Sequence, residues 1–105
     1  MNKYKIELSI PAFYELKSIG DYISYTLMEP DTSKKFIKGL RASISTLSTF
    51  PYRYPPINPD NKHQITRCMP YKNYDIFYSI CEATKTISIT TIGYNKRNWI
   101  HILRL

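Results

Sequence analysis

Apolar and polar side chains alternate along residues 4–9 and then recur at three- and four-residue steps along two longer stretches. Alternation is typical of a strand with one buried face, so residues 4–9 are predicted to form the first strand. The longer period is typical of amphipathic helices, which we expect over residues 11–28 and 32–49. Their apolar positions are Phe13, Leu16, Ile19, Ile23 and Leu27 in the first helix, and Phe36, Ile37, Leu40, Ile44, Leu47 and Phe50 in the second.

The sequence Glu29-Pro30-Asp31 marks the boundary between the two helices. Proline stops the first helix, and Asp31 can cap the second by accepting hydrogen bonds from its free amide groups. Because this connection is short, we expect the helices to pack as an antiparallel hairpin. Residues 51–63 contain four prolines and are predicted to form a surface loop, on which Arg53, Tyr54 and His63 either contact a ligand or belong to a stiff connector.

Three segments rich in β-branched and aromatic residues follow, at residues 64–69, 74–80 and 87–92. The connections between them are too short for a crossover helix, so the three strands are expected to pair antiparallel. Strict alternation would place Ile87, Ile89 and Thr91 on one face of the last strand and Ser88, Thr90 and Ile92 on the other.

The predicted fold class is therefore α+β, in the order β-α-α-β-β-β. An antiparallel sheet would include the N-terminal strand and carry the two-helix hairpin on one face. Residues 1–105 are expected to form a single domain, because a chain of this length can bury one modest core.

Charge is distributed unevenly along this chain. Fifteen Lys and Arg against eight Asp and Glu give a formal net charge of +7, most of it after the predicted loop. Such an excess predicts an anionic partner, either nucleic acid or an acidic protein segment, and the alternative is a basic surface that only favours solubility. The ten tyrosines suit a half-buried working surface, since each joins an apolar ring to a polar tip.

Several kinds of chemistry lack their sequence signature. Cys68 and Cys81 belong to no metal-binding or redox motif, and we expect both to be reduced and half-buried in strands. The chain shows no glycine-rich phosphate loop, no clustered acidic or Cys/His metal ligands, no apolar run long enough to span a membrane and no signal-peptide core. We therefore expect a cytoplasmic protein without a cofactor or a bound metal.

Metal-free cleavage of RNA needs few groups. The 2′-hydroxyl attacks the neighbouring phosphate, so the protein must move protons and stabilise the growing negative charge. Residue types that can do this lie near the predicted strand ends and in the tail. The candidate catalytic residues are Arg67, Tyr94, Lys96, Arg97 and His101. For Arg67 the alternative is an ordinary exposed arginine on a strand.

The element order and several motifs resemble the RelE/ParE superfamily of toxins from bacterial type II toxin–antitoxin pairs. The resemblance rests on Arg67 opening the central hairpin, on the "LSTFPYRYPP" segment after the second helix, and on two spaced motifs. These motifs are Asn-Tyr-x-x-x-Tyr, formed by Asn73, Tyr74 and Tyr78, and Tyr-x-x-Arg-x-Trp, formed by Tyr94, Arg97 and Trp99.

This resemblance implies a toxin that an acidic segment of a cognate antitoxin holds inactive. RelE-like members cut mRNA, often on the ribosome, whereas ParE-like members bind DNA gyrase. Our sequence-based preference is mRNA cleavage, with gyrase inhibition or an inactive antitoxin-binding module as alternatives. Asp75 stands where the RelE pattern has an arginine. Trp99 either stacks a base or packs into the core. The residues expected to contact RNA or another target are Arg53, Lys72, Asn73, Tyr74, Tyr78 and Trp99.

Overall fold

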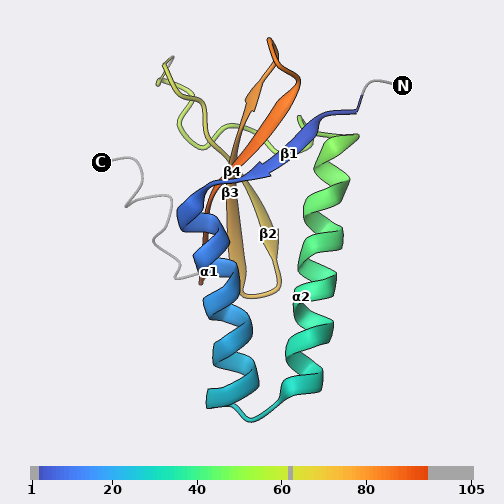
Figure 1. Cartoon of the computed structure of the whole chain (residues 1–105). Coiled ribbons are helices and arrows are strands. Elements are labelled where there is room, and N and C mark those ends of the chain that lie inside the picture. Colours follow the sequence, from blue (N-terminus) through green and yellow to red (C-terminus); the bar gives the residue numbers. More distant parts are fainter. Residues whose placement is uncertain (1–2, 62, 95–105) are drawn as a thin grey trace.

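The computed structural model describes residues 3–61 and 63–94, in which two long helices cover one face of a four-stranded sheet (Figure 1). The α+β class and the helical hairpin on one face are thereby confirmed. Two short helical segments, η1 and η2, extend the long helices. In chain order the elements are β1 (Lys5–Leu8), α1 (Ile10–Asp21), η1 (Tyr22–Thr26), α2 (Pro30–Ser45), η2 (Thr46–Ser48), β2 (Arg67–Tyr71), β3 (Tyr74–Cys81) and β4 (Thr86–Tyr94).

The strand order across the sheet is β1-β4-β3-β2. The pairs β2–β3 and β3–β4 are antiparallel, as expected from their short turns, but β1 pairs parallel with β4. The expectation of a wholly antiparallel sheet is therefore corrected to a mixed sheet. The physical reason is that β1 reaches β4 through the helices and two further strands, and such a long connection permits parallel pairing.

The first helix starts at a side-chain cap. Ser9 Oγ accepts a hydrogen bond of 3.0 Å from the backbone N–H of Ala12, and Pro11 occupies the first turn. The regular helix stops earlier than the expected residue 28, because η1 continues it as a π-helix. Leu16 and Ile19 are buried as predicted, but Phe13 is 53% exposed, and Ala12 takes the core position instead.

The second helix carries the most completely buried part of the predicted stripe. Leu40, Ile44 and Leu47 pack into the core, whereas Phe50 lies beyond the helix and is 63% exposed. Near the tip of the hairpin the two helices are joined by Ser33, whose Oγ donates a 2.7 Å hydrogen bond to the carbonyl oxygen of Gly20.

A β-bulge breaks the alternation in β4. Tyr78 pairs with Ile89 and Phe77 pairs with Thr91, so Thr90 has no partner in the register. Beyond the bulge the two faces are exchanged, and Ile92 is buried at 2% exposure while Thr91 is only partly buried. The predicted grouping of Thr91 with Ile87 and Ile89 is therefore wrong, because one extra residue shifts the period.

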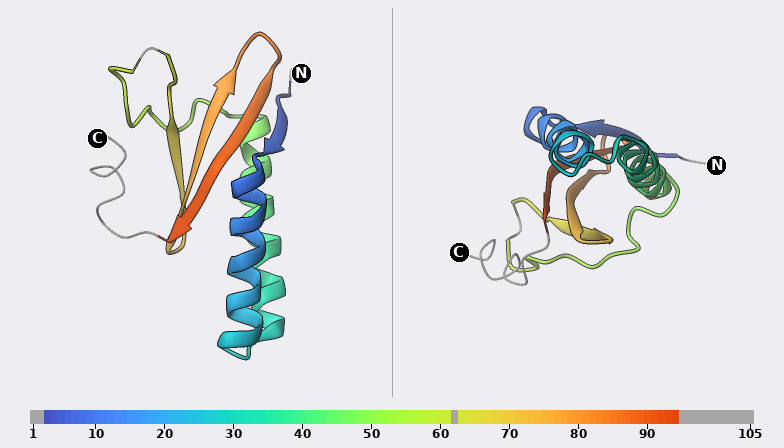
Figure 2. Two further views of the ribbon diagram at one scale, coloured as in Figure 1. Left: turned by 60° about the vertical axis from the view of Figure 1, so that its left-hand side comes forward. Right: turned by 90° about the horizontal axis from the view of Figure 1, so that it is seen from below.

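The tip of the helical hairpin extends past the sheet. In both side views the turn between the helices lies below the nearest strand ends (Figures 1 and 2). Leu27 is therefore 50% exposed, although the sequence placed it on the buried stripe. Met28 in this turn has φ 55°, a conformation that costs a non-glycine residue about 1–3 kcal/mol.

Candidate functional site

The sequence-predicted residues divide into two groups in the part of the chain that the structure describes. Lys72, Asn73, Tyr74 and Tyr94 lie where the β2–β3 turn meets the end of β4. The others, Arg53, Arg67 and Tyr78, lie around the loop that follows η2. Lys96, Arg97, Trp99 and His101 lie outside the described residues.

The two groups are separated by the length of β2. Arg67 opens this strand and Tyr71 closes it. At about 3.3 Å per residue, roughly 13 Å of strand lies between their Cα atoms. Lys72, beyond the end of β2, therefore does not converge with Arg67, at its start, on one atom.

Arg67 holds the loop that runs between η2 and β2. Its Nη1 donates a 2.5 Å hydrogen bond to the carbonyl oxygen of Tyr54, and its guanidinium lies 4.9 Å from the centroid of the Tyr52 ring. A backbone bridge between Pro56 and Arg67 adds to this attachment. The side chain is thus engaged by the protein itself, and part of its donor capacity is used.

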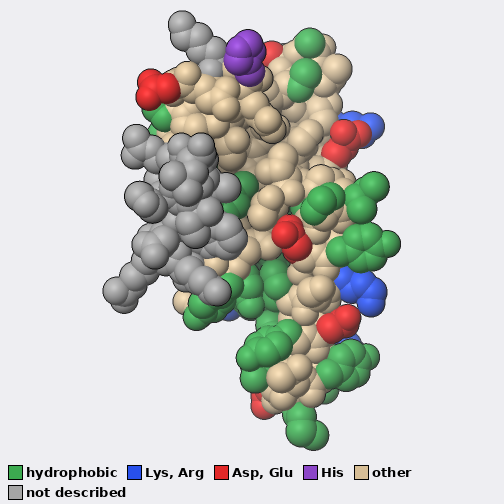
Figure 3. Space-filling view, turned by 90° about the vertical axis from the view of Figure 1, so that its left-hand side faces the viewer, with side chains coloured by type: hydrophobic (Ala, Val, Ile, Leu, Met, Phe, Trp, Pro, Cys, Tyr) green, Lys and Arg blue, Asp and Glu red, His purple; other side chains and the backbone are tan. Residues whose placement is uncertain are grey.

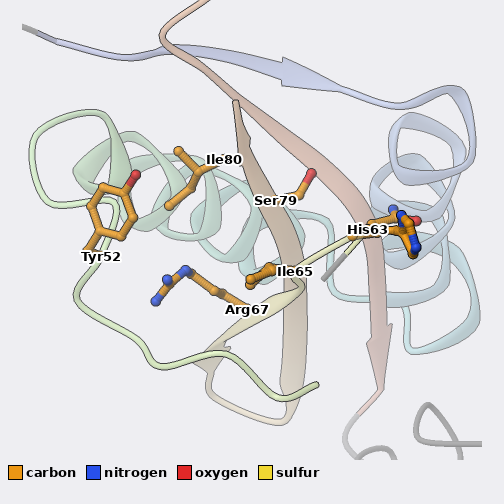
Figure 4. Close-up of a pocket in the computed structure, with 7 residues that line it drawn as sticks. Tyr52, His63, Ile65, Arg67, Ser79 and Ile80 are labelled. Carbon is orange, nitrogen blue, oxygen red and sulfur yellow. The ribbon is translucent and has the colours of Figure 1, made fainter. Parts of the chain in front are cut away.

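A cavity of about 380 Å³ opens beside this arginine (Figure 4). Its size falls in the range of small-molecule sites, and its lining joins apolar walls to a few polar groups. In the close-up, the Arg67 side chain points toward Tyr52 at one side of the cavity, and His63 lies at the other side. The lining residues are Tyr52, His63, Gln64, Ile65, Arg67, Ser79 and Ile80.

Tyr78 and Arg53 also hold the loop that follows η2, through hydrogen bonds to Pro51 and Thr46. The Tyr78 side chain is fully buried, and its hydroxyl donates a 2.8 Å hydrogen bond to the carbonyl oxygen of Pro51. Burial raises the pKa of Tyr78, although the charges of Arg67 and Arg53 act in the opposite direction. Arg53 donates to Thr46 Oγ1. These contacts give Tyr78 a place in the core, where it faces no solvent.

Glu82 lies in the turn between β3 and β4, and it connects this turn to the N-terminal segment and to the loop after η2. Its carboxylate accepts hydrogen bonds from the Tyr4 hydroxyl at 2.7 Å, from the Tyr52 hydroxyl, and from Lys85 Nζ at 2.8 Å. Donation by Lys85 and the two tyrosines lowers the pKa of Glu82 to about 2. The hydrogen bond between Tyr52 and Glu82 raises the pKa of Tyr52 to about 12. Of these three contacts, only the one between Glu82 and Lys85 could be inferred from sequence, because the two residues are three positions apart.

Low pH is expected to weaken the hydrogen bonds that the Glu82 carboxylate accepts from Tyr4, Tyr52 and Lys85. The pKa of Glu82 is lower in the folded chain than its ordinary value of 4.5, so its contribution to stability is complete above pH 4.5 and is lost as the pH falls towards 2. Denaturant unfolding of the wild type and of Glu82→Gln, measured at several pH values, should show a difference at pH 7 that shrinks towards zero near pH 2.

Glu7→Gln is the matched control, because Glu7 is an exposed strand residue whose carboxylate pairs with Lys5 at 3.4 Å. It should change the free energy of unfolding at pH 7 by about 0.5 kcal/mol or less. A Glu82→Gln difference that is the same at every pH would show that the carboxylate contributes nothing through its charge.

Aromatic rings gather at the other group, around the β2–β3 turn. Phe36 of α2 contacts Tyr71 and Tyr74 edge-on, with ring centroids 5.5 and 5.4 Å apart, and Tyr74 contacts Tyr94 at 5.6 Å. Lys72 Nζ lies 5.7 Å from the centroids of both Phe36 and Tyr71. The cluster therefore combines π-faces with one cation, which suits a flat or anionic ligand.

Backbone geometry makes this cluster possible. Lys72 adopts φ 51° in the two-residue turn, and Asn73 completes that turn. On the helix side, a Cβ atom at Gly39 would collide with the Tyr71 hydroxyl, so glycine allows the ring to lie against α2. Burial and the neighbouring tyrosine hydroxyls raise the pKa of Tyr74, which keeps its hydroxyl protonated.

The two cysteines have different surroundings. Cys68 is half-buried in β2, and burial beside Asp75 raises its pKa to about 12. Burial likewise raises the pKa of Asp75, with its hydrogen bond to Cys68 acting against that. Cys81 ends β3 and is exposed, so the expectation that both are half-buried holds only for Cys68.

In residues 3–61 and 63–94, no three His, Cys, Asp or Glu side chains lie close enough together to hold a metal ion. No helix in this part of the chain is long and apolar enough to cross a membrane.

A family model described as the ParE toxin of the type II toxin–antitoxin system, parDE, matches residues 6–99 of this chain. No curated protein matches this chain.

Three solved structures share the fold. A chain from the chromosomal ParDE toxin–antitoxin system of P. aeruginosa has a TM-score of 0.70 at 14% identity, covering 91% of this chain and 100% of that one. The RelBE2 toxin–antitoxin complex of Mycobacterium tuberculosis gives 0.60 at 15% identity, covering 89% and 99%. The isolated RelE toxin of E. coli gives 0.61 at 10% identity, covering 95% and 93%.

Proposed function

Because this chain belongs to the ParE family of toxins from type II toxin–antitoxin systems, we propose that it inhibits growth by binding a protein target, DNA gyrase, without cutting RNA. The sequence-based preference for mRNA cleavage thereby becomes the second candidate. Gyrase and ribosomes are both cytoplasmic, so either activity places the toxin in the cytoplasm.

The observation that carries this proposal is the state of Arg67, the described arginine expected to clamp a phosphate. Its guanidinium already donates to Tyr54 and rests on the Tyr52 ring. Stabilising a reacting phosphate requires several donors about 3 Å from the same oxygen atoms. Lys72 lies at the far end of β2, and Arg53, which lies beside the same loop as Arg67, already donates to Thr46 Oγ1. The described residues thus suit attachment of a loop better than phosphoryl chemistry.

A cognate antitoxin is the proposed partner that keeps this toxin inactive. A groove of about 310 Å³ runs between α1 and α2, with an apolar lining that includes Phe13, Leu16 and Ile37. Lys17 and Arg41 also line it, and Lys17 pairs with Asp21 at 3.5 Å. An acidic amphipathic segment matches such a groove, because it offers an apolar stripe and carboxylates together.

One observation favours RNA cleavage as the second candidate. The aromatic cluster with Lys72 includes Tyr94, and the sequence that follows Tyr94 contains Lys96, Arg97 and His101. Aromatic rings can stack splayed bases, and the cations and histidine can serve phosphate chemistry.

Purified toxin should separate the two activities. We expect it to block supercoiling of relaxed plasmid by gyrase and to leave mRNA intact when incubated with ribosomes and EDTA. Arg67→Ala should still block supercoiling, provided that circular dichroism shows it folded. If Arg67 clamped a scissile phosphate, its loss would instead reduce cleavage about a hundredfold. Cleaved mRNA with normal supercoiling would overturn the gyrase proposal.

Arg67→Lys serves as the control for the loop attachment. Lysine keeps the charge but cannot reproduce the planar guanidinium that both donates to Tyr54 and stacks on Tyr52. Under the gyrase proposal, the lysine and alanine variants should both be less stable than the wild type, and both should still inhibit supercoiling.

A further inference from the structure

The tip of the helical hairpin presents large apolar side chains to solvent. We use the name hairpin tip for residues 22–33, which comprise η1, the turn and the first turn of α2. Four large side chains here are at least half exposed: Tyr22 at 51%, Tyr25 at 75%, Leu27 at 50% and Met28 at 80%. Figure 3 shows hydrophobic side chains gathered at this lower end of the molecule. The tip extends beyond the sheet (Figure 2), so the sheet does not cover these four side chains.

The charge of this region is opposite to that of the whole chain. The charged side chains of the hairpin tip, residues 22–33, are Glu29 and Asp31, in a protein with a net charge of +7, and Lys34 and Lys35 follow the tip in α2. Glu29 and Asp31 are exposed next to Met28. The hairpin tip is therefore an apolar surface with an acidic rim, and it differs from the groove between α1 and α2, which Lys17 and Arg41 help to line.

The backbone at the tip is irregular where its apolar side chains are most exposed. The N–H of Leu27 donates to the carbonyl oxygen of Tyr22 at 3.0 Å, the five-residue step of a π-helix, and such segments are frequent at functional sites. Met28 then adopts φ 55°, where glycine would be unstrained. Burial does not explain why methionine occupies this position, since its side chain lies in solvent.

We propose that the hairpin tip is the surface through which this toxin docks on its protein target, at an apolar site rimmed by lysine or arginine. The proposal rests on the proposed function, in which toxicity comes from binding a protein. Charge complementarity selects the partner's chemistry, because carboxylates repel phosphate backbones and attract basic side chains. Apolar side chains of this size at a protruding position are typical of interface centres.

The test is a double variant, Tyr25→Ser with Met28→Gly. Both side chains are mostly exposed, and glycine relieves the strained φ angle at residue 28, so circular dichroism should show a melting temperature no lower than that of the wild type. We expect the toxin concentration that half-inhibits gyrase supercoiling to rise at least tenfold, and induced cells to resume growth. Ile10→Ser is the matched control, since Ile10 is 74% exposed at the opposite end of α1 and its loss should change neither readout.

The remaining outcomes distinguish the two proposals. A folded double variant that inhibits gyrase and growth as strongly as the wild type overturns the docking proposal and leaves the gyrase proposal intact. A wild-type toxin that cuts mRNA and spares gyrase overturns both. Sedimentation of the wild type and the double variant tests self-association. If the tip variant abolishes a dimer and leaves inhibition unchanged, the tip binds a second copy of this chain and the docking proposal is wrong.

Discussion

Replacing Tyr78 with alanine is expected to remove about 3–5 kcal/mol of folding free energy, a large part of what a domain of this size has. The side chain is fully buried, and it fills the space between the sheet and the loop after η2. Its removal leaves a cavity and also strands the carbonyl oxygen of Pro51 without its 2.8 Å hydrogen bond. Thermal unfolding should show a fall in Tm of more than roughly 12 °C.

Two further tyrosine variants separate the contribution of the Tyr78 hydroxyl from that of its ring, and a buried tyrosine from an exposed one. Tyr78→Phe keeps the ring and loses only the hydroxyl, so it should cost about 1–3 kcal/mol. Tyr25→Ala removes an equally large side chain that is 75% exposed, and it should change stability by about 0.5 kcal/mol or less. Equal stability of Tyr78→Ala and Tyr25→Ala would refute the buried placement of Tyr78.

Ile92→Ala is expected to cost about 2–5 kcal/mol, whereas Thr91→Ala should stay below about 1 kcal/mol. Ile92 lies on the core face because of the bulge at Thr90, and its exposure is 2%. Its backbone N–H also donates a 2.9 Å hydrogen bond to Glu15 Oε1, which ties β4 to α1. Urea unfolding of the two variants measures the difference directly.

This pair of neighbours tests the register of the sheet, because unbroken alternation predicts the reverse order of costs. Ile87→Ala provides the reference on the other side of the bulge, where alternation and structure agree that the side chain is buried. A larger cost for Thr91→Ala than for Ile92→Ala would mean that β4 has no bulge.

Part of the candidate site follows from sequence alone. Lys72, Tyr74 and Tyr94 were all candidate residues, and the structure places Lys72 and Tyr74 against Phe36 and Tyr94 against Tyr74. The attachment of Arg67 to Tyr54 and Tyr52 was not foreseeable, because an irregular proline-rich loop has no period from which to place its residues. The junction at Glu82 was missed for a similar reason, since Tyr4 and Tyr52 are distant from it in sequence.

Hydrophobic periodicity and short connections predict the helices, the strands and the antiparallel hairpin of helices, because each depends on residues that are close together in the chain. The parallel pairing of β1, the exchange of faces at Thr90 and the exposure of Phe13 and Leu27 depend on long-range packing and are seen only in the folded structure. Parallel pairing depends on where a long connection returns, and a bulge adds one residue without a local signal. A helix buries only the part of its apolar stripe that another element covers, and the tip of this hairpin extends past the sheet.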